Sequence, residues 1–408
     1  MTSPDVAPAR SPGSRSGLGV VAVALAFMMV MAFSTSPSPL YGLYKARDGF
    51  SSFTITLIYA AYAIGVIISL FCFGHISDWY GRKRVLVPAV VLSIVSALVF
   101  LFWRALPGLY VGRIVSGLSV GMVTATATAY LGELYAAHRP AASTRRAQLL
   151  ATTANLGGLG LGALLAGLLA EYVAAPLTVP FVVFAVLLTL ALVGVLVSPE
   201  TRAVPEPRPR YRPQRVSVPA EARGRFFASA LGALLGFSAF GLFTGLAGTI
   251  LTTTLHQTSL ALVGLTVFLV FAAGVVSQLT TRNWTVRRTL AAGIVLLLGG
   301  LGLIVLAAWL PSPSLAVFLV GGAFTRAGAG AVFKGTIGTV VAISTDESRA
   351  EALAGLFLAA YVGLSIPIVG LGVALLHVSP KATLLGFAVI VSVAILVAAP
   401  TLLGPGDR

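Results

Sequence analysis

The sequence is poor in charged residues and in cysteine. Only 10% of its 408 residues are charged and 57% are hydrophobic, whereas about a quarter of the residues in an average soluble domain are charged. The single cysteine, Cys72, has no partner for an internal disulfide, which excludes a secreted disulfide scaffold. One or two soluble cores cannot hide so much apolar surface from water. The composition therefore predicts an all-α membrane protein that crosses the bilayer many times.

Motifs for enzyme chemistry or for cofactors are also lacking. The sequence contains no Walker-type phosphate loop, which argues against ATP-driven transport by this chain. No nucleophile has an evident base beside it, and the apolar runs contain no paired acids. The four histidines fall near the ends of these runs, without the spacing of a metal site. We therefore expect no enzymatic activity, no cofactor and no bound metal.

Acidic residues are scarce as well, with 12 Asp and Glu against 27 Lys and Arg. In a soluble protein this balance would suggest nucleic acid. Here, 20 of the 27 basic residues fall on the side of the two termini, and four fall on the other side. Because cytoplasmic loops carry the excess of Lys and Arg, this asymmetry predicts that both termini are cytoplasmic and makes a nucleic-acid partner unnecessary. Abundant Ala, Arg and Gly favour a bacterial plasma membrane.

Apolar runs long enough to cross a bilayer recur along the chain. A spanning helix needs about 20 mostly apolar residues. The first six such runs cover residues 18–40, 54–76, 85–102, 106–131, 147–170 and 177–197. The second six cover residues 226–251, 259–279, 289–310, 315–343, 352–376 and 382–403. These runs predict twelve transmembrane helices embedded in the lipid bilayer.

A stretch rich in proline and arginine separates the two sets of six runs. It has no apolar periodicity, so residues 199–225 are predicted to be a cytoplasmic linker. The predicted domains are a cytoplasmic N-terminal tail (1–17), two six-helix bundles (18–198 and 226–403) and a C-terminal tail (404–408).

An internal repeat supports this division. Three residues of the fourth run and its inner end recur 213 positions later, in and after the tenth run. The pairs are Arg113 with Arg326, Gly117 with Gly330, and Glu133 with Asp346. The repeat indicates that the two bundles are related by pseudo-symmetry.

The segment 74–84, GHISDWYGRKR, follows the second run. It resembles the signature loop between the second and third helices of the major facilitator superfamily, with Trp79 in place of the usual basic residue. Arg113, with two glycines spaced after it, resembles that family's fourth-helix motif, and residues 129–146 resemble the loop that follows. Twelve runs in a six-plus-six repeat extend the likeness over the chain. The resemblance implies two bundles around a central cavity and transport by alternating access.

The resemblance also implies roles for residues of the signature loop. Gly74 would allow close helix packing and Gly81 a tight turn. Asp78 would pair with the positive N-terminal end of the eleventh helix and act as a latch between conformations. Arg82 and Glu133 would belong to the same inner charge cluster, with the two acids as candidates for proton exchange. Alternatively, Asp78 is a solvated interfacial charge and Glu133 pairs with a nearby surface arginine.

Three cations lie within the runs, where an unpaired charge is costly. Arg113 and its repeat partner Arg326 are expected either to reach the outer interface or to line a wet cavity and assist anion binding or coupling. Lys334 lies eight residues beyond Arg326, which is about 12 Å deeper at 1.5 Å per residue. We expect Lys334 to contact substrate in the cavity, because no acid lies at matching depth. It could also exchange a proton itself.

Soft and aromatic side chains complete the predicted cavity. The candidates, from the first, seventh and eleventh runs, are Met29, Phe240, Phe357 and Tyr361. Such side chains form adaptable apolar walls that would suit amphipathic cargo, although ordinary helix packing is the alternative for all four. No surface rich in Gln and Asn, of the kind that sugars need, is evident along the sequence.

The function we expect is secondary active transport by a monomer. By resemblance, a proton is the coupling ion and efflux of a small amphipathic or anionic drug or metabolite is the direction. The glycine-rich residues 155–167 are similar to a motif of antiporter branches, without its proline. Two alternatives stay open. One is an uptake symporter or facilitator for a sugar or organic acid, and the other is a membrane receptor or scaffold that does not transport.

Overall fold

The computed structural model describes residues 12–404, apart from residues 75, 140–143, 203–213, 217, 219 and 346–347. All regular structure in this part of the chain is helical, which confirms the predicted fold class. Twelve candidate spans are long and apolar enough to cross a membrane, and each of the twelve predicted runs overlaps one of them.

The elements of the two halves are as follows. The first half contains α1 (Pro12–Thr35), η1 (Ser38–Leu40), α2 (Tyr41–Asp48), α3 (Ser52–Phe73), α4 (Ile76–Tyr80), α5 (Arg82–Phe102), α6 (Leu106–His138), α7 (Thr144–Tyr172) and α8 (Val179–Val197). The second half contains η2 (Ala220–Ala222), α9 (Arg223–Thr253), α10 (Leu260–Thr280), η3 (Thr281–Asn283), α11 (Val286–Trp309), α12 (Leu315–Ile343), α13 (Arg349–His377) and α14 (Pro380–Leu403).

The first span is broken near its far end, within the Ser/Pro-rich stretch 34–39, whose composition predicts such a break. α1 ends at Thr35 because Pro37 and Pro39 lack the amide hydrogens that would continue the helical bonding. The chain then continues through η1 and α2 as far as Asp48, and the whole counts as one candidate span. The break leaves backbone carbonyls near residue 34 free for other donors.

Other boundaries also differ from the predicted runs. α1 begins at Pro12, inside the predicted N-terminal tail, and α6 continues seven residues past residue 131 to His138. α9 begins at Arg223, within the predicted linker. Residues 1–11 and 405–408, most of the linker, and Asp346 of the repeat lie outside the described residues.

Serine and threonine side chains fix the starts of five spanning helices. Each accepts a hydrogen bond from the backbone N–H three residues later, which satisfies one of the free donors of the first turn. The capping residues are Ser51, Ser259, Thr285, Ser314 and Ser379. These caps explain why the apolar runs begin sharply at their polar borders.

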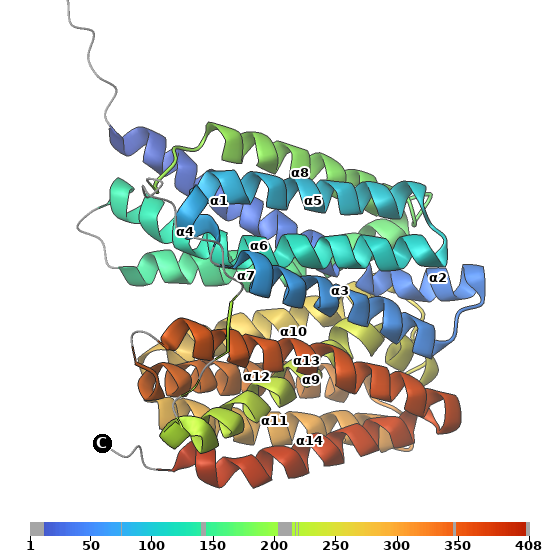
Figure 1. The fold of residues 1–408 in the computed structure, drawn as a ribbon. Coiled ribbons are helices and arrows are strands. Elements are labelled where there is room, and N and C mark those ends of the chain that lie inside the picture. The colour runs from blue at the N-terminus through green and yellow to red at the C-terminus, as the bar shows by residue number, and fades with distance from the viewer. Residues whose placement is uncertain are drawn as a thin grey trace, which may run out of the picture.

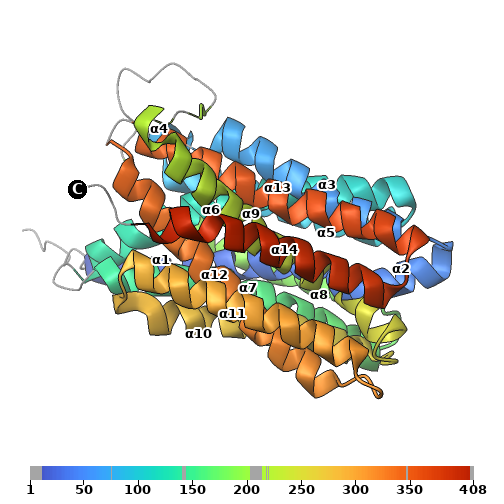
Figure 2. The ribbon, with the colours of Figure 1, turned by 90° about the horizontal axis from the view of Figure 1, so that it is seen from below.

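The two halves form separate bundles (Figure 1). Figure 1 shows the blue-to-green helices of the first half above the yellow-to-red helices of the second half, and Figure 2 shows their axes running roughly alongside one another. Contacts between the halves are made mainly by α7 with α10 and by α3 with α13. The end of the molecule where α1 begins and α14 ends is called the linker face below, because α8 ends and α9 begins there; the opposite end is the far face.

Near the far face the halves are in close contact. A Cβ atom added to Gly167 of α7 would lie 2.5 Å from the carbonyl oxygen of Leu260 of α10, closer than real Cβ atoms come to such an atom. The hydroxyl groups of Tyr59 of α3 and Thr244 of α9 share a hydrogen bond of 2.5 Å across the boundary. These contacts close the boundary below a second pocket of about 460 Å³, which lies between residues 39–55 and 248–263 at the far face itself.

Candidate functional site

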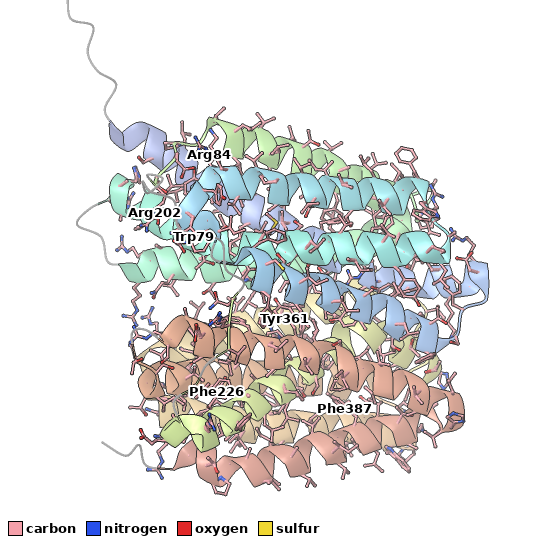
Figure 3. The ribbon with its side chains drawn as sticks, in the orientation of Figure 1. Trp79, Arg84, Arg202, Phe226, Tyr361 and Phe387 are labelled. Carbon is pink, nitrogen blue, oxygen red and sulfur yellow. The ribbon has the colours of Figure 1, made fainter. Side chains whose placement is uncertain are left out.

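A cavity of about 560 Å³ lies between the two bundles. Its lining begins near the middle of α3 and α12, at Tyr62 and Arg326, and extends to Gln148 and Gln278, close to the helix ends at the linker face. Figure 3 shows one lining residue, Tyr361, at the boundary between the bundles. Because the far half is closed, this cavity belongs to the half of the boundary next to the linker face.

The two bundles supply different chemistry to the cavity. The polar residues of the first bundle are neutral: Tyr62, Thr124, Thr128, Gln148, Thr152 and Asn155. The second bundle supplies an aromatic wall, a carboxamide and one cation: Phe237, Phe240, Phe333, Phe357, Tyr361, Gln278 and Arg326. Among the described lining residues there is no Asp or Glu.

Three carboxamides meet at the cavity although the sequence shows no Gln/Asn-rich surface. Gln148 and Asn155 come from α7, and Gln278 comes from the end of α10. Sequence reasoning missed them because they are isolated in glycine- and leucine-rich runs, and only the contact of α7 with α10 brings them together. The sequence does contain one indication: Gln148 and Asn155 are seven residues apart, about two helical turns, so they lie on the same face of one helix.

Arg326 is buried without an acidic partner. Its side chain lines the cavity, yet the residue is only 8% exposed. The guanidinium carbon lies 5.2 Å from the ring centre of Phe240 and 5.1 Å from that of Phe271. Its Nε has no hydrogen-bond partner among the described residues. Two aromatic faces thus hold the cation, and its buried Nε has no acceptor among the described residues.

Arg113, the repeat partner, is not among the residues that line the cavity. It is 2% exposed, and its Nη1 donates to the carbonyl oxygen of Ser34 over 2.7 Å. Its guanidinium carbon lies 4.5 Å from the ring centre of Tyr62 and 5.6 Å from that of Tyr59. Since Tyr62 does line the cavity, Arg113 lies behind it. The expectation of a cavity-lining Arg113 is wrong, because the broken first helix offers it a carbonyl.

The aromatic candidates meet one another in the second bundle. The Phe237 ring contacts Phe240, Phe333 and Tyr361 edge-to-face, with centroid distances of 6.0, 4.9 and 5.6 Å. Phe333 in turn contacts Phe357 at 5.7 Å. The structure therefore places the predicted Phe240, Phe357 and Tyr361 on the cavity wall, and their role in binding remains a prediction.

Met29 is not part of this wall. It is partly buried against the hydrophobic core, whereas Met31, two residues further along α1, lines the cavity. Residues two apart face different sides of a helix, so the methionine cluster was placed on the correct helix but the wrong member was chosen.

Lys334 is not among the residues that line the cavity, although its Nζ reaches the backbone of Gln278, which does line it, and its contact with substrate stays a prediction. Its Nζ donates to Thr281 Oγ1 over 3.2 Å and to the carbonyl oxygen of Gln278 over 3.4 Å. These acceptors are at the C-terminal end of α10, where free carbonyls and the helix dipole favour a cation. Because α10 ends at this depth, Lys334 meets one carbonyl and one hydroxyl oxygen there, and no acid among the described residues.

The signature loop forms a charge cluster at the linker face. Gly81 has φ +101°, which L side chains rarely adopt, so this turn requires glycine. Arg82 pairs with Asp78 at 2.7 Å and with Glu133 at 2.9 Å. Around Gly74, the nearest atom to an added Cβ would be the carbonyl oxygen of Leu70 in the same segment, at 2.7 Å, and a role of this glycine in close helix packing stays a prediction. Within the described residues, Asp78 forms its ion pair with Arg82 and no hydrogen bond or ion pair with α13.

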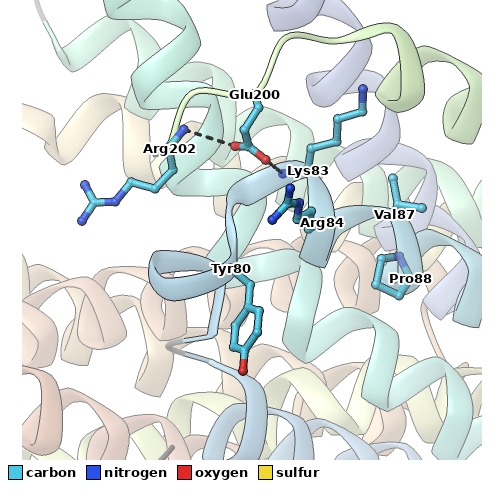
Figure 4. A pocket seen from close by; sticks show the side chains of 7 residues that line it. All are labelled: Tyr80, Lys83, Arg84, Val87, Pro88, Glu200 and Arg202. Atoms are coloured by element: carbon cyan, nitrogen blue, oxygen red, sulfur yellow. Dashed lines mark hydrogen bonds between the residues drawn. The ribbon is translucent and has the colours of Figure 1, made fainter. Parts of the chain in front are cut away.

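Glu200 is a member of this cluster that sequence reasoning missed. Its carboxylate accepts from the backbone N–H groups of Arg82 and Lys83, at 2.9 and 3.0 Å, and so caps the start of α5. Figure 4 shows Glu200 reaching the helix start from the beginning of the linker, with Arg202 beside it. The sequence does contain one indication of its importance: Glu200 comes just after the sixth run, in a chain with only 12 acidic residues.

A second contact joins the bundles at the linker face. Arg145, at the start of α7, donates to Oδ1 of Asn283, which follows α10. Asn283 is the last residue of η3, so the start of α7 and the turn after α10 join the bundles at the linker side of the cavity.

Comparisons with known proteins agree with this fold. The family model of the Major Facilitator Superfamily matches residues 23–310. The arabinose-proton symporter of Bacillus subtilis is 29% identical over 92 residues, which are 22% of this chain and 20% of that protein. The chain thus matches about a fifth of the length of this curated relative.

Solved structures show the same architecture. The nucleoside transporter NupG aligns with a TM-score of 0.72 and 11% identity, over 93% of this chain and 99% of that chain. The peptide transporter POT, in complex with alafosfalin, aligns with a TM-score of 0.75 and 14% identity, over 95% and 93%. At such identities the likeness shows the fold alone. Because the family model spans well over half of the residues and the fold agrees, the chain belongs to the Major Facilitator Superfamily of membrane transporters.

Proposed function

We propose that this protein is a proton-coupled secondary transporter that exports a small amphipathic or anionic drug or metabolite. The bundles of residues 18–198 and 226–403 would rock about the cavity, exposing it to each side of the membrane in turn. The closed far half and the cavity next to the linker face correspond to one end state of such a cycle.

The orientation follows from the distribution of basic residues. Twenty of the 27 Lys and Arg residues belong to the linker side, which we propose to be cytoplasmic. The structure would then be the inward-open state in the plasma membrane, and an exporter would collect its substrate from the cytoplasm in this state.

Arg326 is the single observation that carries the substrate part of the proposal. A buried cation without an acidic partner is costly, and an anionic substrate in the cavity would offset that cost. The absence of acids among the described lining residues supports an anion over a cation.

Proton coupling would use the linker-face cluster rather than the cavity. Asp78 and Glu133 are the candidate groups, with side-chain exposures of 48% and 30%. Asp78 pairs with Arg82 here. We propose that it meets the start of α13 when the linker face closes, since the positive end of a helix favours an anion.

The test is a ligand-stabilisation screen of purified protein, followed by transport of the hits in proteoliposomes. A binder raises the apparent stability in proportion to its affinity. We expect anionic hits to bind Arg326→Gln roughly 10–100-fold more weakly, the value of a charge-assisted contact. Arg326→Lys is the matched control and should retain part of the affinity. Unchanged binding of anions by Arg326→Gln would contradict the proposal.

Uptake of a sugar or an organic acid is the alternative, and two observations favour it. The arabinose-proton symporter is among the relatives, and Gln148, Asn155 and Gln278 give the cavity the carboxamides that a sugar would need. Proteoliposomes with an imposed proton gradient separate the two proposals. Substrate that moves against the proton flow supports export, and substrate that moves with it supports uptake.

A further inference from the structure

The cavity is divided into three chemically different parts, and this division points to a narrower substrate class. We infer that the substrate is a hydroxylated aromatic carboxylate, whose carboxylate pairs with Arg326, whose ring packs on the aromatic wall and whose hydroxyl groups face the first bundle. This inference rests on the proposed function and names the cargo of the same cavity.

The described lining of the cavity offers a single positive charge to a ligand. Arg326 is the one charged side chain among the described residues of the lining. The rings of Phe240 and Phe271 cover it and offer no hydrogen-bond acceptor, so its Nε stays unpaired. One carboxylate would complete this site. A cationic ligand would meet repulsion, although the aromatic wall alone would suit it.

The aromatic wall adjoins this cation. Rings from α9, α12 and α13 are joined by edge-to-face contacts through Phe237 and Phe333, and Phe240 both contacts Phe237 and covers Arg326. Such rings bind a further ring in offset or edge-to-face geometry. A flat ring bearing a carboxylate could therefore contact the wall and the guanidinium together, which a sugar acid could do less well.

The opposite wall requires hydroxyl or similar neutral groups. The hydroxyls of Thr124 and Thr128 donate to carbonyl oxygens of their own helix at 2.7 Å, so they present acceptor lone pairs to the cavity. The side chains of Gln148 and Asn155 form no hydrogen bond among the described residues and provide both donors and acceptors. These groups match phenolic hydroxyls better than they match a purely apolar cargo.

The volume is consistent with this class. About 560 Å³ lies within the range of pockets that hold drug-sized molecules. A ring with a short acidic chain at one end and hydroxyl groups at the other fits within it and leaves room for substituents.

The experiment measures the affinity of purified wild-type protein for four related probes by thermal unfolding. The reference probe is 3,4-dihydroxycinnamate, which carries all three features. Its amide lacks the charge, glucuronate lacks the aromatic ring, and cinnamate lacks the hydroxyl groups. We expect the amide and glucuronate each to bind at least about tenfold more weakly than the reference, and cinnamate about three- to tenfold more weakly.

Two variants assign the features to residues. Asn155→Leu should lower the affinity for 3,4-dihydroxycinnamate severalfold and leave the affinity for cinnamate unchanged, a difference that general destabilisation cannot produce. Phe357→Leu should weaken the three aromatic probes and not glucuronate. Because both comparisons are made between probes on one protein, a partial loss of folded yield does not affect them.

The outcomes that overturn the inference are distinct from those that overturn transport. The inference fails if the amide or glucuronate binds as tightly as the reference, or if no aromatic acid of the panel binds at millimolar concentration. The proposed transport function fails separately, if spin labels on both faces of the protein show no exchange between inward-open and outward-open states with any hit of the broader screen.

Discussion

Arg113 and Arg326 stand at equivalent positions of the two repeats, yet the two bundles use them differently. Arg113 has a carbonyl acceptor at 2.7 Å and two tyrosine rings, and it is sealed behind Tyr62. Arg326 has two phenylalanine rings, no acceptor among the described residues and a place on the cavity. A repeat thus preserves the position of a residue, while its neighbours decide whether the residue holds the fold together or binds a ligand.

The largest expected effect is on the stability of Arg113→Ala. The substitution leaves a cavity, a buried carbonyl of Ser34 without its donor and two tyrosine rings without their cation. We expect it to lower the free energy of unfolding by about 2–4 kcal/mol. Thermal unfolding and the monodisperse yield in detergent measure this loss.

The matched control for this prediction is Arg326→Ala. It removes a buried cation that has no acceptor, so the gain from not burying the charge opposes the lost ring contacts. We expect its stability to change by less than about 1 kcal/mol. Equal losses in the two variants would mean that both arginines are structural, and the contrast between the repeats would disappear.

The next prediction concerns Tyr59, which lies over Arg113 and also bonds across to the second bundle. Its hydrogen bond to Thr244 joins the two bundles near the far face, so we expect this bond to break when that face opens. Tyr59→Phe removes about 1 kcal/mol from this state, which should shift the equilibrium about fivefold toward the far-open state. Accessibility of single cysteines introduced on each face measures the shift.

A variant at the other face provides the control for Tyr59→Phe. If Asp78 latches the linker face when that face is closed, Asp78→Asn should shift the equilibrium in the opposite direction, toward the linker-open state seen here. If both variants shifted the equilibrium in the same direction, the change in cysteine accessibility would not reflect the two separate contacts. An unchanged equilibrium in Asp78→Asn would remove the latch.

The fold could be predicted almost completely from the sequence, because length and hydrophobicity alone determine how many helices can span a bilayer. The Ser/Pro-rich stretch 34–39 predicts the break in the first helix, but no sequence pattern shows that the freed carbonyl of Ser34 accepts a hydrogen bond from Arg113. Whether an intramembrane arginine finds an acceptor depends on a helix about 80 residues away in the sequence. The predicted symmetry of the two arginines failed for that reason.

The candidate site was predictable only in part. Its aromatic wall comes from residues that stand out in the sequence, whereas its carboxamides come from isolated residues of two separate helices. Aromatic residues such as Phe357 and Tyr361 are conspicuous on one helix and were identified as a group. Gln148, Asn155 and Gln278 are single polar residues in long apolar runs, and they gain meaning only when α7 packs on α10. Glu200 was missed because its partners are backbone N–H groups, which leave no trace in a sequence pattern.

The smallest expected effect is that of substituting Lys334. This residue lies on α12, as Arg326 does, but its ammonium group bonds to oxygen atoms at the end of α10. Lys334→Ala removes two long hydrogen bonds, one to the buried Thr281 and one to the half-buried Gln278. We expect a loss of about 0.5–1 kcal/mol in stability and a transport rate per folded protein within about twofold of wild type. The measurement normalises initial transport rates to the monodisperse protein in the same proteoliposomes, with Lys334→Arg as the charge-preserving control. A tenfold lower normalised rate in Lys334→Ala, restored by Lys334→Arg, would return this lysine to the substrate path and would mean that α12 offers two cations to the cargo.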